Sequence, residues 1–312
     1  MDDAKLKKLR IRGNMMIICA TIIWGAGMSA QAAGMEHVSP LTFNAARFFI
    51  GGTMALGPAL FFLRRQKAQP QDSSKPAPIS KGTILAGIIC GLVLCLAINL
   101  QQFGIVFTSV ANAAFITSLY VIMVPIACLF IFKHKVPVFV WIGVAVAMAG
   151  MYFLSLSGGI NLNLGDILVF ACAIAFSVQI IIISHFSPKH NVLALACVQF
   201  YTVFVVSLLL AFIFETPSIA DLVAAGPFVL YTGVLSSGVA YILQMKAQKT
   251  TEPTVAAVLF SFESVVATFT GWIVLSQFLT PRQMLGCALI FVAILVAQIP
   301  ANAIKRKGGM AQ

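Results

Sequence analysis

The sequence predicts an all-α membrane protein with ten transmembrane helices, arranged as two inverted five-helix repeats with both termini in the cytoplasm. Three observations support this prediction: the composition, the spacing of the apolar segments, and the side of the membrane on which the basic residues would lie. Of the 312 residues, 60% are hydrophobic and 9% are charged, and the mean hydropathy is +0.98. Because a soluble domain carries about 25% charged residues, a soluble globular protein is excluded.

Ten apolar segments are each long enough to cross a bilayer as a helix. In chain order these segments are 13–34, 40–63, 81–107, 110–132, 136–155, 164–184, 192–214, 222–245, 253–276 and 281–303. The one long polar connection is 64–80, whose Pro, Ser and Gln content is typical of a solvated loop. We therefore divide the chain into a cytoplasmic N-terminal segment, two five-helix repeats and a cytoplasmic C-terminal tail, which span 1–12, 13–155, 156–303 and 304–312.

The Lys and Arg residues are distributed very unevenly between the two sides of these segments. Of the 20, eighteen flank the ends that would share one face, whereas Arg282 lies on the other face and Arg47 lies inside a segment. The positive-inside rule then places both termini in the cytoplasm. Cytoplasmic loops account for the net charge of +11, so we expect no nucleic-acid partner. A cleavable leader ending near Ala30-Gln31-Ala32 is the alternative for the first segment, and its loss would leave nine helices.

The two halves of the sequence show an internal repeat. A shift of 143 residues aligns 98–125 with 241–268 and gives six identities in 28 pairs, among them Gln101 with Gln244 and Ser118 with Ser261. A unit of five helices forces its second copy to enter the membrane from the opposite side, which is the inverted topology of many secondary transporters. In such folds the solute site lies near the membrane midplane, between the repeats.

Several short motifs occur along both repeats. They are Trp24-Gly25, Ser39-Pro40-Leu41 followed by Arg47, Thr108-Ser109 before Ala113-Ala114, Gly165-Asp166-Ile167-Leu168, Glu252-Pro253 and Leu279-Thr280-Pro281-Arg282-Gln283. In these motifs the sequence resembles the EamA-type proteins of the drug/metabolite transporter superfamily, over essentially all ten segments. The resemblance implies a secondary transporter of the cell inner membrane that moves small polar metabolites by alternating access, with export of amino acids or related metabolites as the favoured activity.

Motifs for catalysis, nucleotide binding and metal binding are missing from the sequence. It contains no GxxxxGK[ST] phosphate loop, no HExxH and no GxSxG. Its seven cysteines all lie in apolar segments without CxxC spacing, and its four histidines lie in loops or near the membrane interfaces. We therefore expect no enzymatic activity, no cofactor and no metal, and we expect a small-molecule substrate and membrane lipid as the partners.

Two ionisable residues, Arg47 and Glu263, lie deep inside apolar segments. Burying either charge in lipid costs several kcal/mol unless it faces a cavity or a partner. The repeat pairs Glu263 with Tyr120, so both side chains should approach the midplane near the pseudo-twofold axis. Two roles are open for Glu263, a proton carrier or a carboxylate that binds an ammonium group, and a structural ion pair is the alternative for Arg47. A zwitterion held between Arg47 and Glu263 is the most specific form of the amino-acid hypothesis.

Other polar and aromatic side chains complete the predicted site, because aromatic faces bind aromatic or cationic solutes. The predicted substrate-binding residues are Trp24, Asn44, Arg47, Asn99, Tyr120, Tyr241, Gln244, Phe262 and Glu263. A wider polar set should also face the centre, with helix–helix hydrogen bonds as the alternative for most of its members: Gln101, Gln102, Ser177, Gln179, Tyr231, Ser236, Ser237 and Ser261.

Two other functions stay open at this point. A carrier for cationic compounds, such as quaternary ammonium solutes or drugs, would use Glu263 and the aromatic residues as a cage. A channel or a non-transporting membrane scaffold would use the polar residues for helix packing alone. Packing is also the prediction for Gly143, Ala147 and Gly150, whose spacing forms a small face on which a second helix can approach closely.

Overall fold

The computed structural model describes residues 3–67, 80–108, 110–130, 133, 136–155, 163–275 and 280–299. Every regular element in these ranges is a helix, in agreement with the predicted all-α class. The predicted tail 304–312 and most of the predicted loop 64–80 lie outside the described residues.

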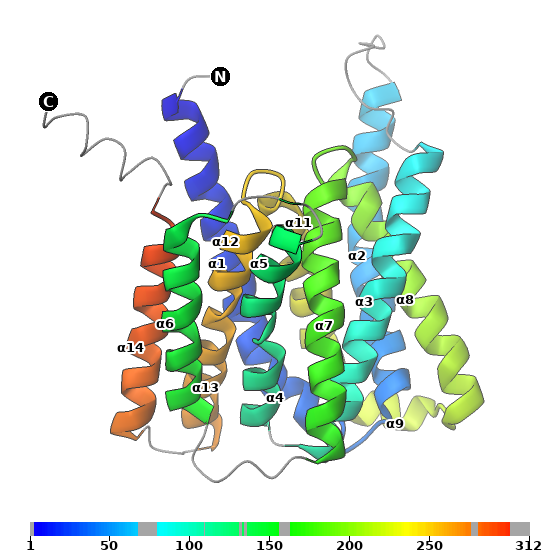
Figure 1. Ribbon diagram of the computed structural model, residues 1–312. Coiled ribbons are helices and arrows are strands. Elements are labelled where there is room, and N and C mark those ends of the chain that lie inside the picture. The colour runs from blue at the N-terminus through cyan, green and yellow to red at the C-terminus, as the bar shows by residue number, and fades with distance from the viewer. Residues whose placement is uncertain are drawn as a thin grey trace, which may run out of the picture.

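The helices follow the apolar segments in chain order (Figure 1). They are α1 (Asp3–Gly34), α2 (Pro40–Lys67), α3 (Lys81–Phe107), α4 (Val110–Thr117), α5 (Tyr120–Phe130), α6 (Val138–Ser155), α7 (Leu164–Phe186), α8 (Val192–Phe214), α9 (Ile219–Ala224), α10 (Gly226–Tyr231), the π-helix η1 (Thr232–Ala240), α11 (Tyr241–Ala247), α12 (Pro253–Phe260), α13 (Phe262–Leu275) and α14 (Pro281–Ala297).

Seven helical stretches of the described residues are long and apolar enough to cross a membrane. Two shorter apolar helices, Val138–Leu154 and Pro281–Ala297, accompany them. The helix α2 carries Arg47 in its interior and a basic end, Arg64-Arg65-Gln66-Lys67. The chain is thus a multi-pass helical protein, and the number of ten spans stays a prediction.

Polar side chains at the helix starts explain where several helices begin. Ser80 accepts a hydrogen bond from the backbone N–H of Thr83 at the start of α3. Asn163 with Asp166 at α7, and Thr280 with Gln283 at α14, form reciprocal capping boxes that satisfy otherwise unpaired backbone N–H groups.

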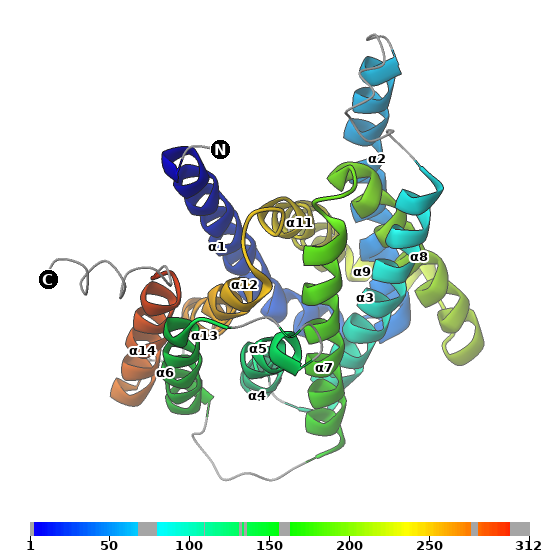
Figure 2. The ribbon, with the colours of Figure 1, turned by 45° about the horizontal axis from the view of Figure 1, so that its top comes forward.

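The directions of the helices agree with two inverted halves. In Figure 1, α1 begins and α14 ends at the upper end of the molecule, whereas α7 begins at the lower end. Helices that the repeat makes equivalent also pack on each other, α2 on α8 and α6 on α14. Figure 2 shows α6 and α14 at one edge and α2, α3 and α8 at the other, with the remaining helices between them. This central group surrounds the site described below.

Two of the predicted continuous segments are interrupted near their middles, and a third, 222–245, is broken near its start at Ala225, between α9 and α10. The segment 110–132 is broken between α4 and α5, and the segment 253–276 is broken at Ser261 between α12 and α13. The shift of 143 residues relates the starts of the two broken segments, Val110 and Pro253, and also their breaks. At each break a serine hydroxyl donates to a backbone carbonyl, Ser118 Oγ to Ala114 at 2.8 Å and Ser261 Oγ to Val258 at 2.6 Å. Such bonds compete with the helical ladder and bend helices.

The two interruptions contact each other near the middle of the molecule. Ser118, at the first break, forms a hydrogen bond of 2.9 Å through its Oγ with Ser264 Oγ, in the first turn of α13. Trp24 and Phe176 each pack against both large apolar clusters, one centred on α5, α6, α12 and α14 and the other on α3, α7 and α8. The space between these two clusters is where the polar side chains gather.

Candidate substrate-binding cavity

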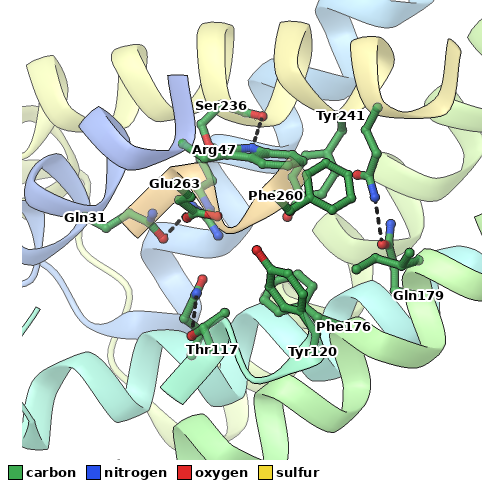
Figure 3. A pocket seen from close by; sticks show the side chains of 14 residues that line it. Gln31, Arg47, Thr117, Tyr120, Phe176, Gln179, Ser236, Tyr241, Phe260 and Glu263 are labelled. Atoms are coloured by element: carbon green, nitrogen blue, oxygen red, sulfur yellow. Dashed lines mark hydrogen bonds between the residues drawn. The ribbon is translucent and has the colours of Figure 1, made fainter. Parts of the chain in front are cut away.

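A cavity lies between the two halves, beside the two helix interruptions (Figure 3). The empty space within its walls, part of it open to solvent, amounts to ≈ 510 Å³. The lining residues are Trp24, Gln31, Arg47, Gln101, Thr117, Tyr120, Phe176, Gln179, Ile180, Ser236, Tyr241, Gln244, Phe260 and Glu263.

The lining of this cavity reflects the repeat. The shift of 143 residues relates three pairs of lining residues, which are Gln101 with Gln244, Thr117 with Phe260, and Tyr120 with Glu263. Thr117 and Phe260 are the last residues of α4 and α12, before the two breaks. Tyr120 and Glu263 follow the same breaks, in the first turns of α5 and α13. The cavity therefore lies close to the pseudo-twofold axis, which is where inverted-repeat folds bind solutes.

Arg47, on α2, supplies a positive charge to one side of the cavity. Its side chain is buried, its Nη1 donates to Gln31 Oε1 at 2.8 Å, and its guanidinium carbon lies 5.1 Å from the centre of the Phe48 ring. Its Nε has no hydrogen-bond partner among the described residues, and neither does Arg47 form an ion pair with any of them. The positive charge is therefore oriented by an amide and an aromatic ring without being neutralised.

Glu263 supplies a carboxyl group to the same side. It is the second residue of α13, directly after the interruption at Ser261, so its carboxyl lies at the positive end of a half-helix dipole. No described residue forms a hydrogen bond or an ion pair with its side chain. Figure 3 shows Glu263 beside Gln31 and Arg47, at one end of the cavity.

Amide side chains line other parts of the wall. Gln244 Nε2, on α11, donates to Gln179 Oε1, on α7, at 3.1 Å. Gln101 Nε2 donates to Thr117 Oγ1 at 3.4 Å. Each of these two contacts links two helices of the same half, α11 with α7 in the second half and α3 with α4 in the first.

Aromatic rings form the apolar part of the wall. The Trp24 ring centre lies 4.9 Å from that of Tyr241 and 5.7 Å from that of Phe260, and the Tyr120 ring meets Phe260 edge-on at 6.3 Å. Trp24 Nε1 donates at 3.2 Å to the carbonyl oxygen of Ser236, which lies in the π-helix η1. π-Helical turns are often found at functional sites. The wall thus combines aromatic faces with the guanidinium of Arg47 and the carboxyl of Glu263.

Comparison with known proteins identifies the family. The model of the EamA-like transporter family matches residues 11–156 and 163–298. The chain belongs to the EamA-like transporter family. The resemblance to EamA-type proteins of the drug/metabolite transporter superfamily is therefore confirmed, and this EamA-like chain is a membrane transporter of a family that does not consist of enzymes.

Relatives and a solved structure agree with this assignment. An uncharacterized transporter of Archaeoglobus fulgidus is 32% identical to the EamA-like chain over 93% of this chain and 87% of its own length. The uncharacterized transporter YoaV of Bacillus subtilis is 24% identical over 90% of this chain and 94% of its own length. One crystal structure superposes with a TM-score of 0.74 at 18% identity, covering 94% of this chain and 98% of the other, which indicates a shared fold.

The structure brings six of the nine predicted site residues of the EamA-like chain into one cavity. They are Trp24, Arg47, Tyr120, Tyr241, Gln244 and Glu263. Asn44 and Asn99 lie outside it, where Asn44 Nδ2 donates to Asn99 Oδ1 at 2.7 Å and Asn99 Nδ2 donates to Ser207 Oγ at 3.0 Å. Phe262 also lies outside the cavity, packed against the apolar cluster of α5, α6, α12 and α14. Those three side chains contribute to helix packing in this structure.

Sequence reasoning missed five lining residues altogether, which are Gln31, Thr117, Phe176, Ile180 and Phe260. Helical spacing carries the signal that would have found most of them. Gln31 follows Trp24 by seven residues, Phe176 precedes Gln179 by three, and Ile180 follows Ser177 by three. Each lies on the same helix face as a residue that the sequence did single out.

Proposed function

We propose that this protein is a secondary transporter of the cell inner membrane that carries a small zwitterionic metabolite, an amino acid or a close relative, out of the cell by alternating access. The substrate-binding residues in this proposal are the predicted residues that line the cavity, joined by Gln31. The observation that carries the proposal is that Arg47 and Glu263 face one cavity without pairing with each other.

Electrostatics explains why this arrangement suits a zwitterion. Isolated charges buried in a membrane protein are expensive, so unpaired intramembrane charges mark ligand or ion pathways. A solute carboxylate gains a guanidinium partner at Arg47, and a solute ammonium group gains a carboxylate partner at Glu263. Both charges of the protein are then compensated by one molecule, which a singly charged solute cannot do.

Alternating access requires elements that move against each other around the site. The half-helices α4, α5, α12 and α13 end or begin beside the cavity, and the hydroxyl contact between Ser118 and Ser264 joins the two breaks. Movement of these short segments opens the cavity to one side of the membrane and then to the other. Glu263 binds either the ammonium group or a proton, and this competition couples solute export to proton entry.

Counterflow in proteoliposomes tests the proposal. Vesicles are preloaded with one unlabelled solute from a panel of amino acids, quaternary ammonium compounds and sugars, and entry of the same labelled solute is followed. We expect saturable counterflow of amino acids whose half-saturating concentration rises strongly in Glu263→Gln and in Arg47→Ala. Exchange of cations alone would replace the zwitterion with the cationic-compound carrier, and conduction without saturation would indicate a channel. A folded protein that exchanges no solute would favour the scaffold.

A further inference from the structure

The pair of buried amides Gln179 and Gln244 is incompletely hydrogen-bonded inside the cavity. The two side chains are 1% and 2% exposed, and a single hydrogen bond of 3.1 Å joins them. Gln179 Nε2 and Gln244 Oε1 have no partner among the described residues. Turning both amides over exchanges the roles of the two residues and still leaves one NH2 group and one carbonyl oxygen without any partner.

Buried polar atoms in proteins are nearly always paired, and an unpaired one costs stability. Gln101, the repeat counterpart of Gln244, is different because its amide donates to Thr117 and is absent from the unpaired buried atoms of the described residues. The open donor and acceptor are therefore a feature of one side of the cavity and not of the repeat. Figure 3 shows Gln179 across the cavity from Gln31 and Glu263.

We infer that the open pair Gln179–Gln244 recognises a primary carboxamide at the end of the solute opposite its charged groups, so that the preferred substrates are zwitterionic amino acids with an amide side chain. The inference rests on the proposed function and specifies its substrate class. Both amides line the same cavity, and the hydrogen bond between them holds them side by side, so a carboxamide placed there has both unpartnered groups next to it. The solute N–H donates to Gln244 Oε1, and the solute carbonyl accepts from Gln179 Nε2.

Other side chains of similar size fit the pair less well. A carboxylate has no donor and places negative charge against Gln244 Oε1, and a thioether leaves both free atoms of the pair unsatisfied. Sites built to hydrogen-bond a substrate group discriminate strongly against analogues that lack it. We therefore expect glutamine to compete at least about tenfold more strongly than glutamate or methionine.

The test is competition in counterflow with the full-length reconstituted protein. Vesicles preloaded with glutamine take up labelled glutamine, and external asparagine, glutamate and methionine compete over a concentration series. The half-inhibitory concentrations of glutamate and methionine should exceed those of the carboxamides by at least about tenfold. In Gln179→Leu and in Gln244→Leu, the half-inhibitory concentration of methionine should exceed that of glutamine by about twofold or less.

Gln199→Leu is the matched control. Gln199 is fully buried with both amide atoms unpaired among the described residues, but it lies outside the cavity, so this variant should keep the native preference. Equal competition by glutamine and methionine in the native protein overturns the inference and leaves the zwitterion carrier intact. The same holds if the preference survives in both cavity variants. Absence of counterflow for every amino acid overturns the proposed function itself. The native preference is measurable without any variant, so a misfolded substitution does not block the test.

Discussion

Replacement of Gly150 by alanine should weaken the contact between α6 and α14, which the sequence singles out as a small helix face. An added Cβ on Gly150 would lie 2.8 Å from the carbonyl oxygen of Gly286, and one on Gly286 would lie 2.6 Å from the carbonyl oxygen of Gly150. Ordinary carbon–oxygen contacts are about 3.3–3.6 Å, so the two backbones must separate by roughly half an ångström. Overpacking of this kind costs about 1–3 kcal/mol.

Gly82→Ala is the control variant, because it changes helix propensity in the same way without the overpacking. An added Cβ on Gly82 would meet its nearest neighbour, Ser80 Oγ, at 3.5 Å, which is an ordinary contact. Both variants gain up to about 0.8 kcal/mol of helix propensity, so their difference in unfolding free energy reports the overpacking cost. We expect Gly150→Ala to be less stable than Gly82→Ala by about 1–3 kcal/mol in chemical unfolding in mixed micelles. Equal stabilities of the two variants would refute the close backbone approach of α6 and α14.

Three further substitutions have expected outcomes in the same unfolding assay. Glu215→Gln should cost about 1 kcal/mol, because the Glu215 carboxylate accepts from the backbone N–H and hydroxyl of Thr42 at 2.9 and 2.7 Å at the start of α2. Asn99→Leu should cost about 1–3 kcal/mol, because it removes the hydrogen bonds that Asn99 makes with the buried side chains of Asn44 and Ser207. Arg10→Ala should change stability by less than about 0.5 kcal/mol, because its 3.8 Å ion pair with Glu252 joins two exposed side chains.

A different result would contradict each of these three expectations. A neutral effect of Glu215→Gln would mean that the start of α2 does not depend on this carboxylate. A loss above about 1 kcal/mol in Arg10→Ala would mean that the ion pair belongs to a larger network. A stable Asn99→Leu would mean that its partners find other hydrogen bonds in the variant.

Hydropathy predicted the extent of uninterrupted helices well. The segments 81–107 and 192–214 coincide with α3 and α8, because apolar residues fill each span from one interface to the other. Hydropathy could not predict the breaks at Ser118 and Ser261. A serine in an apolar run scores as one weakly polar residue, and its bond to the backbone depends on the local conformation.

The two ionisable residues of the cavity could be predicted from the sequence, whereas its uncharged lining residues could be predicted only in part. Arg47 and Glu263 stand out because buried charges in a membrane need compensation. Phe260 lines the cavity, although the sequence predicted Phe262. The cause is local, because α12 ends at Phe260 and helical periodicity does not continue across the break. Asn44 and Asn99 are polar residues of the kind that line solute sites, but they form a hydrogen bond with each other outside the cavity, which the sequence does not reveal.

The central claim is that Arg47 and Glu263 bind opposite charges of one solute, and counterflow with matched analogues tests it most directly. Half-saturation is measured for an amino acid, for the amine that lacks its carboxylate and for the acid that lacks its amino group. The account predicts that the native protein prefers the amino acid to both analogues, that Glu263→Gln loses the preference over the acid, and that Arg47→Ala loses the preference over the amine. A native protein that prefers the amine, or variants that weaken all three solutes equally, would contradict it.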